Sequence, residues 1–231
     1  MKRTLIKTGD GSFTLQLEGW NEQYHSKHGA IAEALHVFIK EGLYHWCSQN
    51  HFSTVSILEI GFGTGLNCFL TFLKAEKEGW QINYIGVEGF PLGLEEASSL
   101  KYASTLSDRY PGKNLQETEN IFSRLHEVPW EKEEGITSDF FLTKQQKKFS
   151  EITDQAKFNI IYFDAFGIRV QPELWTETIF QKMYEALKPN GILVTYAANG
   201  NARRAMQAVG FSVERLPGPP GKKEMMRAIK P

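Results

Sequence analysis

The sequence predicts an α/β protein with a doubly wound, mainly parallel, Rossmann-like sheet. From residue 54 onwards, short apolar runs alternate with segments of helical periodicity, which is the order of elements that builds a parallel sheet. The first apolar run ends in alternating glycines, Gly61-Phe62-Gly63-Thr64-Gly65, directly before a helical segment. Turns of this kind lie at the carboxyl edge of open α/β sheets, where ligands bind. A chain of 231 residues is long enough to bury one substantial core.

The elements of this sheet are expected in a regular order along the chain. Strands are expected at 55–60, 82–88, 140–142, 158–164 and 191–196. Helices are expected at 67–77, 94–106, 115–125, 176–187 and 203–209. A closing antiparallel hairpin is expected at 211–215 and 224–229, around a loop rich in proline and glycine.

Two other segments have a different character. A turn signal at 8–12 precedes an alternating strand at 13–17, and apolar residues at helical spacing follow between 31 and 39. We therefore expect residues 1–50 to form a hairpin and a helix that pack on a core domain of residues 51–231. The segment 131–148 carries many charges of both signs, which favours a solvated insertion.

Composition narrows the class of protein. The formal net charge is −1, so a nucleic-acid partner would need a local basic patch. The two cysteines, Cys47 and Cys68, have no metal-ligand spacing and suggest a reducing compartment. No apolar run is long enough to span a bilayer or to serve as the core of a signal peptide. We expect a cytoplasmic protein that does not bind membranes.

The glycine loop indicates a nucleoside site. A dinucleotide-binding loop requires Gly-x-Gly-x-x-Gly, but Leu66 follows Gly65 here, and a phosphate-binding P-loop requires a lysine that this loop lacks. Glu88 ends the second strand, where a carboxylate can accept hydrogen bonds from both hydroxyls of a ribose. Together these residues favour the site of a methyl donor, S-adenosylmethionine, over that of a dinucleotide.

Two further carboxylates stand at strand ends. Glu59 precedes the glycines, where it either meets the cationic amino-acid end of the donor or serves as a cap or salt-bridge partner. Asp164 ends the third strong strand, at the edge where α/β enzymes place their chemistry. An aspartate there can accept a hydrogen bond from an amine and orient its lone pair for methyl transfer. The alternative for Asp164 is a turn residue that satisfies local backbone donors.

Taken in order, several motifs resemble one known family. The chain is similar to the methyltransferase domain of the bifunctional tRNA 5-methylaminomethyl-2-thiouridine biosynthesis proteins, in the stand-alone form without the oxidase domain. The motifs that carry the resemblance span most of the chain and are Asp10-Gly11-Ser12, Asn21-Glu22-Gln23-Tyr24-His25-Ser26, Gly29-Ala30, Glu33, His36-Val37-Phe38, Gly61-Phe62-Gly63-Thr64-Gly65-Leu66-Asn67, Glu88-Gly89-Phe90-Pro91-Leu92, Phe163-Asp164-Ala165-Phe166, Pro172-Glu173-Leu174-Trp175, Arg203-Arg204, Gly210-Phe211 and Gly221-Lys222-Lys223-Glu224-Met225.

The resemblance implies a reaction and a set of site residues. The family methylates the primary amine of 5-aminomethyl-2-thiouridine at the tRNA wobble position, and a separate enzyme would supply that aminomethyl intermediate. By this likeness Asp164 faces the amine, and the segment Tyr24-His25-Ser26 borders the site. The cofactor would be held by residues around the glycine loop, namely Glu59, Gly61, Gly63, Thr64, Gly65, Asn67 and Glu88.

The chain departs from the family at one point. Family members carry Gly-Asp after the next strand, and that aspartate contacts the adenine of the cofactor. The nearest segment here, Phe140-Phe141-Leu142-Thr143-Lys144, lacks the pair. No residue can therefore be named for the adenine from the sequence.

The remaining candidates concern the tRNA anticodon stem-loop. Phe166 and Trp175 are candidates for stacking on an extruded base, with core packing as the alternative. The basic residues Arg203, Arg204, Lys222 and Lys223 are candidates for phosphate contacts, with ordinary solvated side chains as the alternative. A metal site is not expected, because His25, His28 and His36 do not by themselves complete a ligand set.

Three other functions stay open at this stage. A nicotinamide-dependent oxidoreductase is disfavoured by Leu66, and binding of S-adenosylmethionine against NAD separates the two. A methyltransferase acting on a small-molecule amine would suit the modest net charge. A non-catalytic tRNA-binding module is disfavoured by the intact glycine loop, Glu88 and Asp164.

Overall fold

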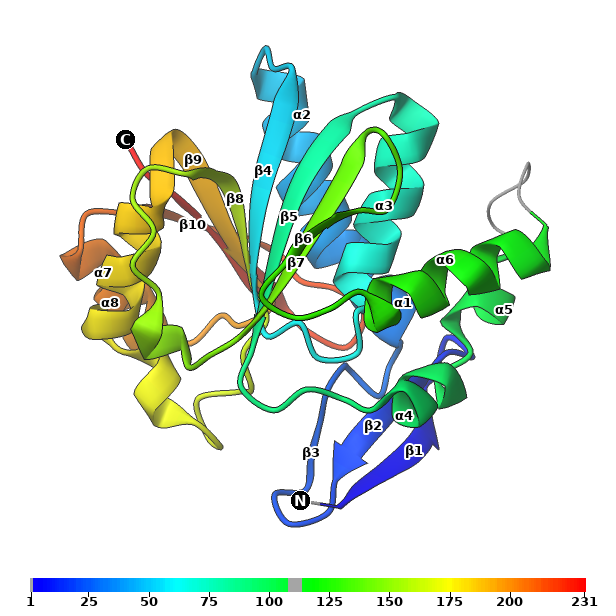
Figure 1. Cartoon of the computed structure of the whole chain (residues 1–231). Coiled ribbons are helices and arrows are strands. Elements are labelled where there is room, and N and C mark those ends of the chain that lie inside the picture. The colour runs from blue at the N-terminus through cyan, green and yellow to red at the C-terminus, as the bar shows by residue number, and fades with distance from the viewer. Residues whose placement is uncertain (1, 108–113) are drawn as a thin grey trace.

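The computed structural model describes residues 2–107 and 114–231, which form a large mixed sheet and a small antiparallel sheet (Figure 1). Parallel pairing joins the five central strands β9, β8, β4, β5 and β7, and antiparallel strands complete both edges. The strands of the large sheet, in spatial order, are β10 (Ser212–Pro217), β11 (Glu224–Ile229), β9 (Leu187–Thr195), β8 (Phe158–Phe163), β4 (Thr54–Ile60), β5 (Gln81–Glu88), β7 (Phe140–Gln146) and β6 (Glu133–Gly135). This order confirms the Rossmann-like fold that the sequence predicts.

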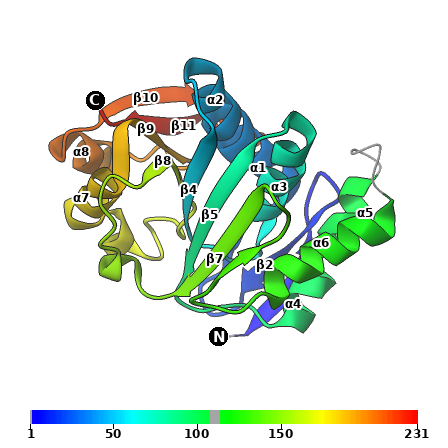
Figure 2. The ribbon, with the colours of Figure 1, turned by 45° about the horizontal axis from the view of Figure 1, so that its top comes forward.

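Helices cover both faces of the large sheet, as Figure 2 shows. One face carries α7 and α8, and the opposite face carries the helices of the N-terminal region together with α3 and α6. Each face has its own cluster of buried apolar side chains, as expected for strands that are apolar on both sides. The helices that follow β4 along the chain are α3 (Leu66–Glu78), α4 (Leu94–Ser99), α5 (Tyr102–Ser107), α6 (Leu115–Glu127), α7 (Glu177–Ala186) and α8 (Gly200–Ala208), with short 3-10 turns η2 (Phe149–Glu151) and η3 (Pro172–Trp175). No helix within the described residues is long and apolar enough to cross a membrane.

The N-terminal region has two parts. The strands β1 (Arg3–Lys7), β2 (Phe13–Leu17) and β3 (Glu22–Gln23) form the small sheet. A helical run follows, made of α1 (Ala30–Ala34), the π-helical η1 (Leu35–Tyr44) and α2 (His45–Gln49). Its apolar side chains, including Ile31, Phe38 and Leu43, belong to the same buried cluster as the sheet. The helix predicted around 31–39 is thus longer and is integrated in the core, while the small sheet lies near the carboxyl ends of the strands (Figure 1).

The structure corrects two expectations about elements. The helix expected at 94–106 is two helices, separated at Lys101, which has a left-handed φ of 52°. The expected solvated insertion at 131–148 is wrong, because this segment contains the β6–β7 hairpin and β7 is a parallel strand of the sheet. Lys144 in β7 is only 1% exposed, and its ammonium lies 5.0 Å from the centre of the Trp130 ring. Charge density failed as a signal because the long lysine packs its apolar stem inside the sheet.

Candidate active site

The glycine loop lies at the carboxyl end of β4 and has a backbone that only glycine adopts readily. Gly61, Gly63 and Gly65 have positive φ angles of 90°, 46° and 71°. A Cβ on Gly61 would lie 2.7 Å from the carbonyl oxygen of Asp164, so the loop and the end of β8 touch through their backbones. Bare backbone is therefore held open at the point where α3 begins, the arrangement expected of a ligand cradle.

Glu88 is tied to the glycine loop from the next strand. Its Oε2 accepts a hydrogen bond from the Gly63 N–H at 2.9 Å, and its Oε1 accepts one from the Phe90 N–H at 2.9 Å. The carboxylate is half-buried at the edge of the sheet and keeps further lone pairs for a ligand. This fixed acceptor fits the two hydroxyls of a ribose.

The segment 24–26 closes over the same loop. The Tyr24 ring lies 3.1 Å from the position of a Cβ on Gly63, and His25 Nε2 lies 2.6 Å from Thr64 Oγ1. Burial lowers the pKa of His25 to about 4, so the imidazole is neutral at physiological pH. The Ser26 N–H donates to Glu33 Oε1 at 3.0 Å. The structure thus brings Tyr24 and His25 next to the glycine loop, and Ser26 next to Glu33.

Asp164 shares one amide with Glu59. The Asn67 Nδ2 group, in the first turn of α3, donates to Asp164 Oδ2 and to Glu59 Oε1, each at 2.9 Å. Glu59 is completely buried and also accepts from the Tyr84 hydroxyl at 2.8 Å. In this structure Glu59 exposes no surface to a ligand, so its connection to the site runs through Asn67. Desolvation raises the pKa of Glu59 well above its usual range.

Asp164 is a carboxyl group with a perturbed protonation equilibrium. Desolvation by burial, followed by the negative charge of Glu33, raises its pKa to about 7. The hydrogen bond from Asn67 and the positive charge of Lys222 act in the opposite direction. A carboxylate poised near neutrality is suited to accept a proton, whereas an ordinary aspartate is too weak a base at pH 7.

Glu33 and Lys222 form a pair that the sequence did not predict, because Lys222 was expected to contact phosphates and Glu33 was only part of a resemblance motif. Glu33 is 4% exposed, and its Oε2 lies 2.5 Å from Lys222 Nζ. The same ammonium lies 3.7 Å from the centre of the Tyr196 ring, and the Tyr196 hydroxyl donates to the carbonyl of Ala165 at 2.9 Å. Glu33 belongs to a motif of the resemblance, but no periodicity or spacing relates residues 33, 196 and 222. Only the fold joins α1, the end of β9 and the β10–β11 loop beside Asp164.

The other expected substrate residues fall into two groups. Phe166 is half-buried and packs its ring edge-on against Tyr24, with ring centres 5.1 Å apart, beside the glycine loop. Trp175 is 3% exposed, packs against Phe163 and Phe180, and donates its indole N–H to the Phe166 carbonyl at 2.8 Å. Of the two alternatives for Trp175, the buried ring therefore favours core packing over stacking on a base.

The four basic candidates differ in their exposure. Arg203 and Arg204 lie on α8, where Arg203 is half-buried and Arg204 is exposed. Lys223 is exposed on the β10–β11 loop. Lys222 instead turns inward to Glu33. The side chains of Arg203, Arg204 and Lys223 thus reach solvent, and that of Lys222 lies beside Glu33.

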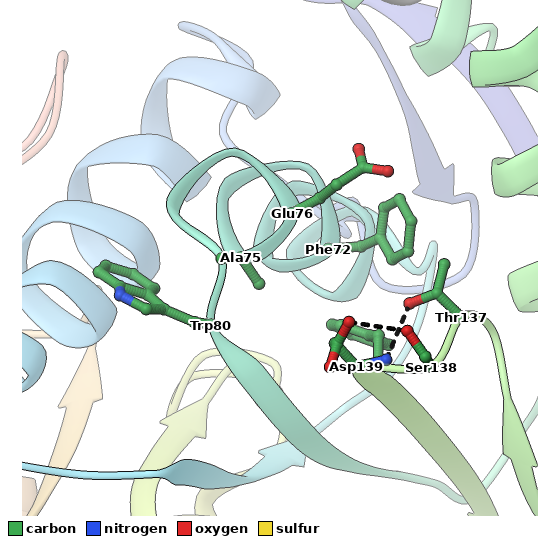
Figure 3. Close-up of a pocket in the computed structure, with 9 residues that line it drawn as sticks. Phe72, Ala75, Glu76, Trp80, Thr137, Ser138 and Asp139 are labelled. Carbon is green, nitrogen blue, oxygen red and sulfur yellow. Dashed lines mark hydrogen bonds between the residues drawn. The ribbon is translucent and has the colours of Figure 1, made fainter.

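One described pocket lies away from these residues. It has a volume of about 240 Å³ and is formed where α3 ends and β5 and β7 begin (Figure 3). In Figure 3, Glu76 from α3 and Thr137, Ser138 and Asp139 from the β6–β7 turn surround it. None of the expected site residues lines this pocket, which is at the opposite end of the strands from the glycine loop. The candidate site therefore rests on the glycine loop, Glu88 and Asp164 and does not include this pocket.

A Rossmann-like sheet, a glycine cradle without phosphate-binding lysine and a ribose-type carboxylate define a nucleoside-cofactor enzyme of the methyltransferase class. The chain belongs to the S-adenosyl-L-methionine-dependent methyltransferase family, whose family model matches residues 113–231. S-adenosylmethionine is therefore its cofactor. The positive φ angles of the glycine loop and the free lone pairs of Glu88 fit such a nucleoside.

Individual relatives agree with this assignment. The chain is 28% identical to the tRNA 5-methylaminomethyl-2-thiouridine biosynthesis bifunctional protein MnmC of Leptospira interrogans, over 95% of this chain and 34% of that protein. It is also 28% identical to the protein of the same name from Cupriavidus metallidurans, over 89% of this chain and 31% of that protein. The chain thus spans about a third of the length of these curated relatives.

Solved structures share the fold. The structure of MNMC2 from Aquifex aeolicus superposes with a TM-score of 0.76 at 22% identity, covering 98% of this chain and 69% of that chain. Spermidine synthase from Thermotoga maritima superposes with a TM-score of 0.58 at 16% identity, covering 99% of this chain and 68% of that chain. At these identities the likeness is one of architecture.

Proposed function

We propose that this chain methylates the primary amine of 5-aminomethyl-2-thiouridine, or its oxygen analogue, at the wobble position of tRNA, giving the 5-methylaminomethyl product. The names of the relatives that match nearly the whole chain support this substrate. The observation that carries the proposal is Asp164, whose carboxyl accepts a hydrogen bond from Asn67 at the start of α3 and has a pKa raised by burial to about 7. A separate enzyme would supply the aminomethyl nucleoside.

The cofactor is held by the residues at the carboxyl edge of β4 and β5. We expect the backbone of Gly61, Gly63 and Gly65 to approach it closely, and Glu88 to accept hydrogen bonds from its ribose. Asn67 and Thr64 stand at the start of α3, where they border the amino-acid end, and Glu59 orients the Asn67 amide. When bound, S-adenosylmethionine supplies an electrophilic methyl group on its sulfonium.

Asp164 prepares the substrate amine. Asn67 donates to Oδ2, which leaves Oδ1 to accept a hydrogen bond from the amine and to aim its lone pair. An ammonium has no lone pair, so the amine must be neutral when it reacts and must lose a proton afterwards. The carboxylate takes up that proton at neutral pH because its pKa is near 7.

The base and the tRNA are met by different surfaces. Phe166 and Tyr24 present aromatic rings beside Asp164, against which an extruded base can pack. Arg203, Arg204 and Lys223 extend from elements that adjoin the same edge and can contact phosphates. The tRNA would thus be held at its backbone while one base enters the site.

One experiment tests this proposal directly. The protein is incubated with tRNA that carries 5-aminomethyl-2-thiouridine and with cofactor labelled in its methyl group, and the tRNA nucleosides are analysed by mass spectrometry. We expect one labelled methyl group on the wobble nucleoside. Label that appears only on an added small-molecule amine, and never on tRNA, would replace this proposal with a small-molecule methyltransferase.

A further inference from the structure

The carboxyl end of β7 lies next to Glu88, on the side where the adenine base of a bound cofactor would extend. Gln146, the last residue of β7, is the register partner of Glu88, so the two lie side by side on neighbouring strands. On its other side Glu88 is bonded to Gly63 of the glycine loop. A nucleoside with its ribose on Glu88 and its amino-acid end on the glycine loop must therefore extend its base over the end of β7.

One carboxylate is fixed at this position from outside the strand. Glu131 Oε1 accepts a hydrogen bond from the Gln146 N–H at 2.7 Å, and the Glu131 N–H donates to the Lys144 carbonyl at 2.8 Å. Both contacts tie Glu131 to the last residues of β7. Among the described residues, the second oxygen, Oε2, accepts no hydrogen bond and takes part in no ion pair, and the side chain is exposed. Glu131 therefore offers a free, charged acceptor.

The backbone of Glu131 is held in an unusual conformation. Its φ is 63°, in the left-handed region that a residue with a Cβ rarely adopts. The neighbouring Trp130 makes an isolated bridge to Lys144, whose ammonium donates to the His126 carbonyl at 2.5 Å. The Lys144 carbonyl and the Gln146 N–H hold Glu131 in this conformation, so the position of its carboxylate is set by the backbone of β7.

The spacing suits a nucleoside. Glu131 is bonded to the side of β7 that faces away from β5, so it lies about two strand spacings from β5, or roughly 10 Å. That is the scale of a nucleoside from its ribose hydroxyls to the exocyclic amine of its base. The Phe90 ring is 75% exposed in the loop directly after Glu88 and offers an apolar surface for the face of a purine.

We propose that Glu131 recognises the adenine of S-adenosylmethionine by accepting a hydrogen bond from its exocyclic amine through Oε2. Glu131 thereby supplies the adenine contact that this sequence lacks after the strand at 140–146. A carboxylate accepts from the amine of adenine but finds no donor on a purine that lacks the amine. The proposal concerns cofactor binding, so it stands or falls independently of the tRNA substrate.

The test measures binding by calorimetry with two ligands, S-adenosylhomocysteine and its analogue with unsubstituted purine in place of adenine. We expect the wild-type chain to bind the adenine compound roughly tenfold more tightly, the size of one charge-assisted hydrogen bond. Equal affinity of the wild type for both ligands overturns the proposal. This comparison needs no mutation and is unaffected by folding defects.

Glu131→Gln isolates the residue. The amide oxygen of the variant can still accept from the Gln146 N–H, but its NH₂ group then faces the base and cannot accept from the exocyclic amine. We expect about a tenfold loss of affinity for S-adenosylhomocysteine and little change for the purine analogue. The matched control is Glu133→Gln, an exposed glutamate of the same hairpin, which should leave both affinities unchanged. An equal loss for both ligands, or no loss for either, contradicts the proposal.

Discussion

At the scale of single residues, burial makes the ionised form of Asp164 energetically unfavourable. Folding raises the pKa of this carboxyl from 3.8 to about 7, chiefly by desolvation, so the folded chain binds the proton more tightly than the unfolded chain does. Stability that depends on this group is therefore present at low pH and is lost as the pH rises from about 4 through 7. A residue that costs stability at working pH is typical of catalysis rather than of packing.

Asp164→Asn is expected to lose activity and gain stability. Methyl transfer should fall about 100-fold or more, because the proton acceptor is gone. The free energy of unfolding above pH 7 should rise by on the order of 1–2 kcal/mol over wild type, and the difference should vanish below about pH 4. Denaturant unfolding at several pH values checks this. Asp139→Asn, at an exposed position at the other end of the sheet, is the control and should change neither property. A variant that turns over normally would refute the role of Asp164.

Glu33 and Lys222 should move the pH dependence of activity in opposite directions. Activity requires ionised Asp164, so we expect the rate to rise with pH through about 7. Glu33→Gln removes a negative charge and should shift this rise to lower pH, and Lys222→Met removes a positive charge and should shift it to higher pH. Other groups that interact with Asp164 are Glu59, Tyr102 and Tyr196, which stay in place in both variants.

Profiles of kcat against pH at saturating cofactor check this prediction. Shifts of the same sign in both variants would show that the pair acts by shape rather than by charge. Both variants must first be shown to bind S-adenosylhomocysteine normally.

At the scale of elements, the glycine loop and the end of β8 constrain each other. Gly61→Ala places a methyl group 2.7 Å from the Asp164 carbonyl, at a φ of 90°, and a backbone atom cannot move aside cheaply. We expect a loss of about 1–3 kcal/mol in unfolding free energy and a weaker affinity for S-adenosylhomocysteine. Gly200→Ala is the control, because its Cβ would meet only the flexible Arg204 side chain at 3.5 Å in α8. Thermal unfolding and calorimetry check both; tight binding by Gly61→Ala would contradict the close-packed geometry.

Elements also differ in how well periodicity predicted them. Strands such as β4 and β8 are apolar on both faces and were predicted closely, because their signal needs no partner. The strand β7 was predicted too short and its surroundings were predicted as solvated. Its buried positions alternate with half-buried ones, and the third buried position is Lys144, which composition alone assigns to the surface.

At the scale of the whole molecule, the first 50 residues complete both the core and the site. They contribute buried Ile31, Phe38 and Leu43 to the core, and Tyr24 and Glu33 to the site. The division into 1–50 and 51–231 stays a prediction. Because the two parts share one buried cluster, we expect the segment 51–231 alone to unfold without a cooperative transition.

Removal of residues 2–7 alone is the milder comparison. The side chains of β1 are exposed or half-buried, so the rest of the chain should keep its fold. Thermal unfolding followed by near-ultraviolet circular dichroism distinguishes the two truncations. A cooperative, stable segment 51–231 would establish it as an independent domain.

The sequence by itself determined the fold class, the glycine loop, and the positions of Glu88 and Asp164 at the ends of their strands. These features depend on local signals, such as apolar period, glycine spacing and an acid at a strand end, which act within a few residues. The family resemblance supplied the substrate that local signals do not encode.

Only the tertiary structure decided which side chains act together. It placed Glu33, Tyr196 and Lys222 beside Asp164, moved Trp175 into the core and put Glu131 at the end of β7. These residues come from separate elements that pack against one another, and their roles follow from burial and from distance through space. Burial also sets the pKa of Asp164, because desolvation depends on everything that surrounds a group and not on its neighbours in the chain.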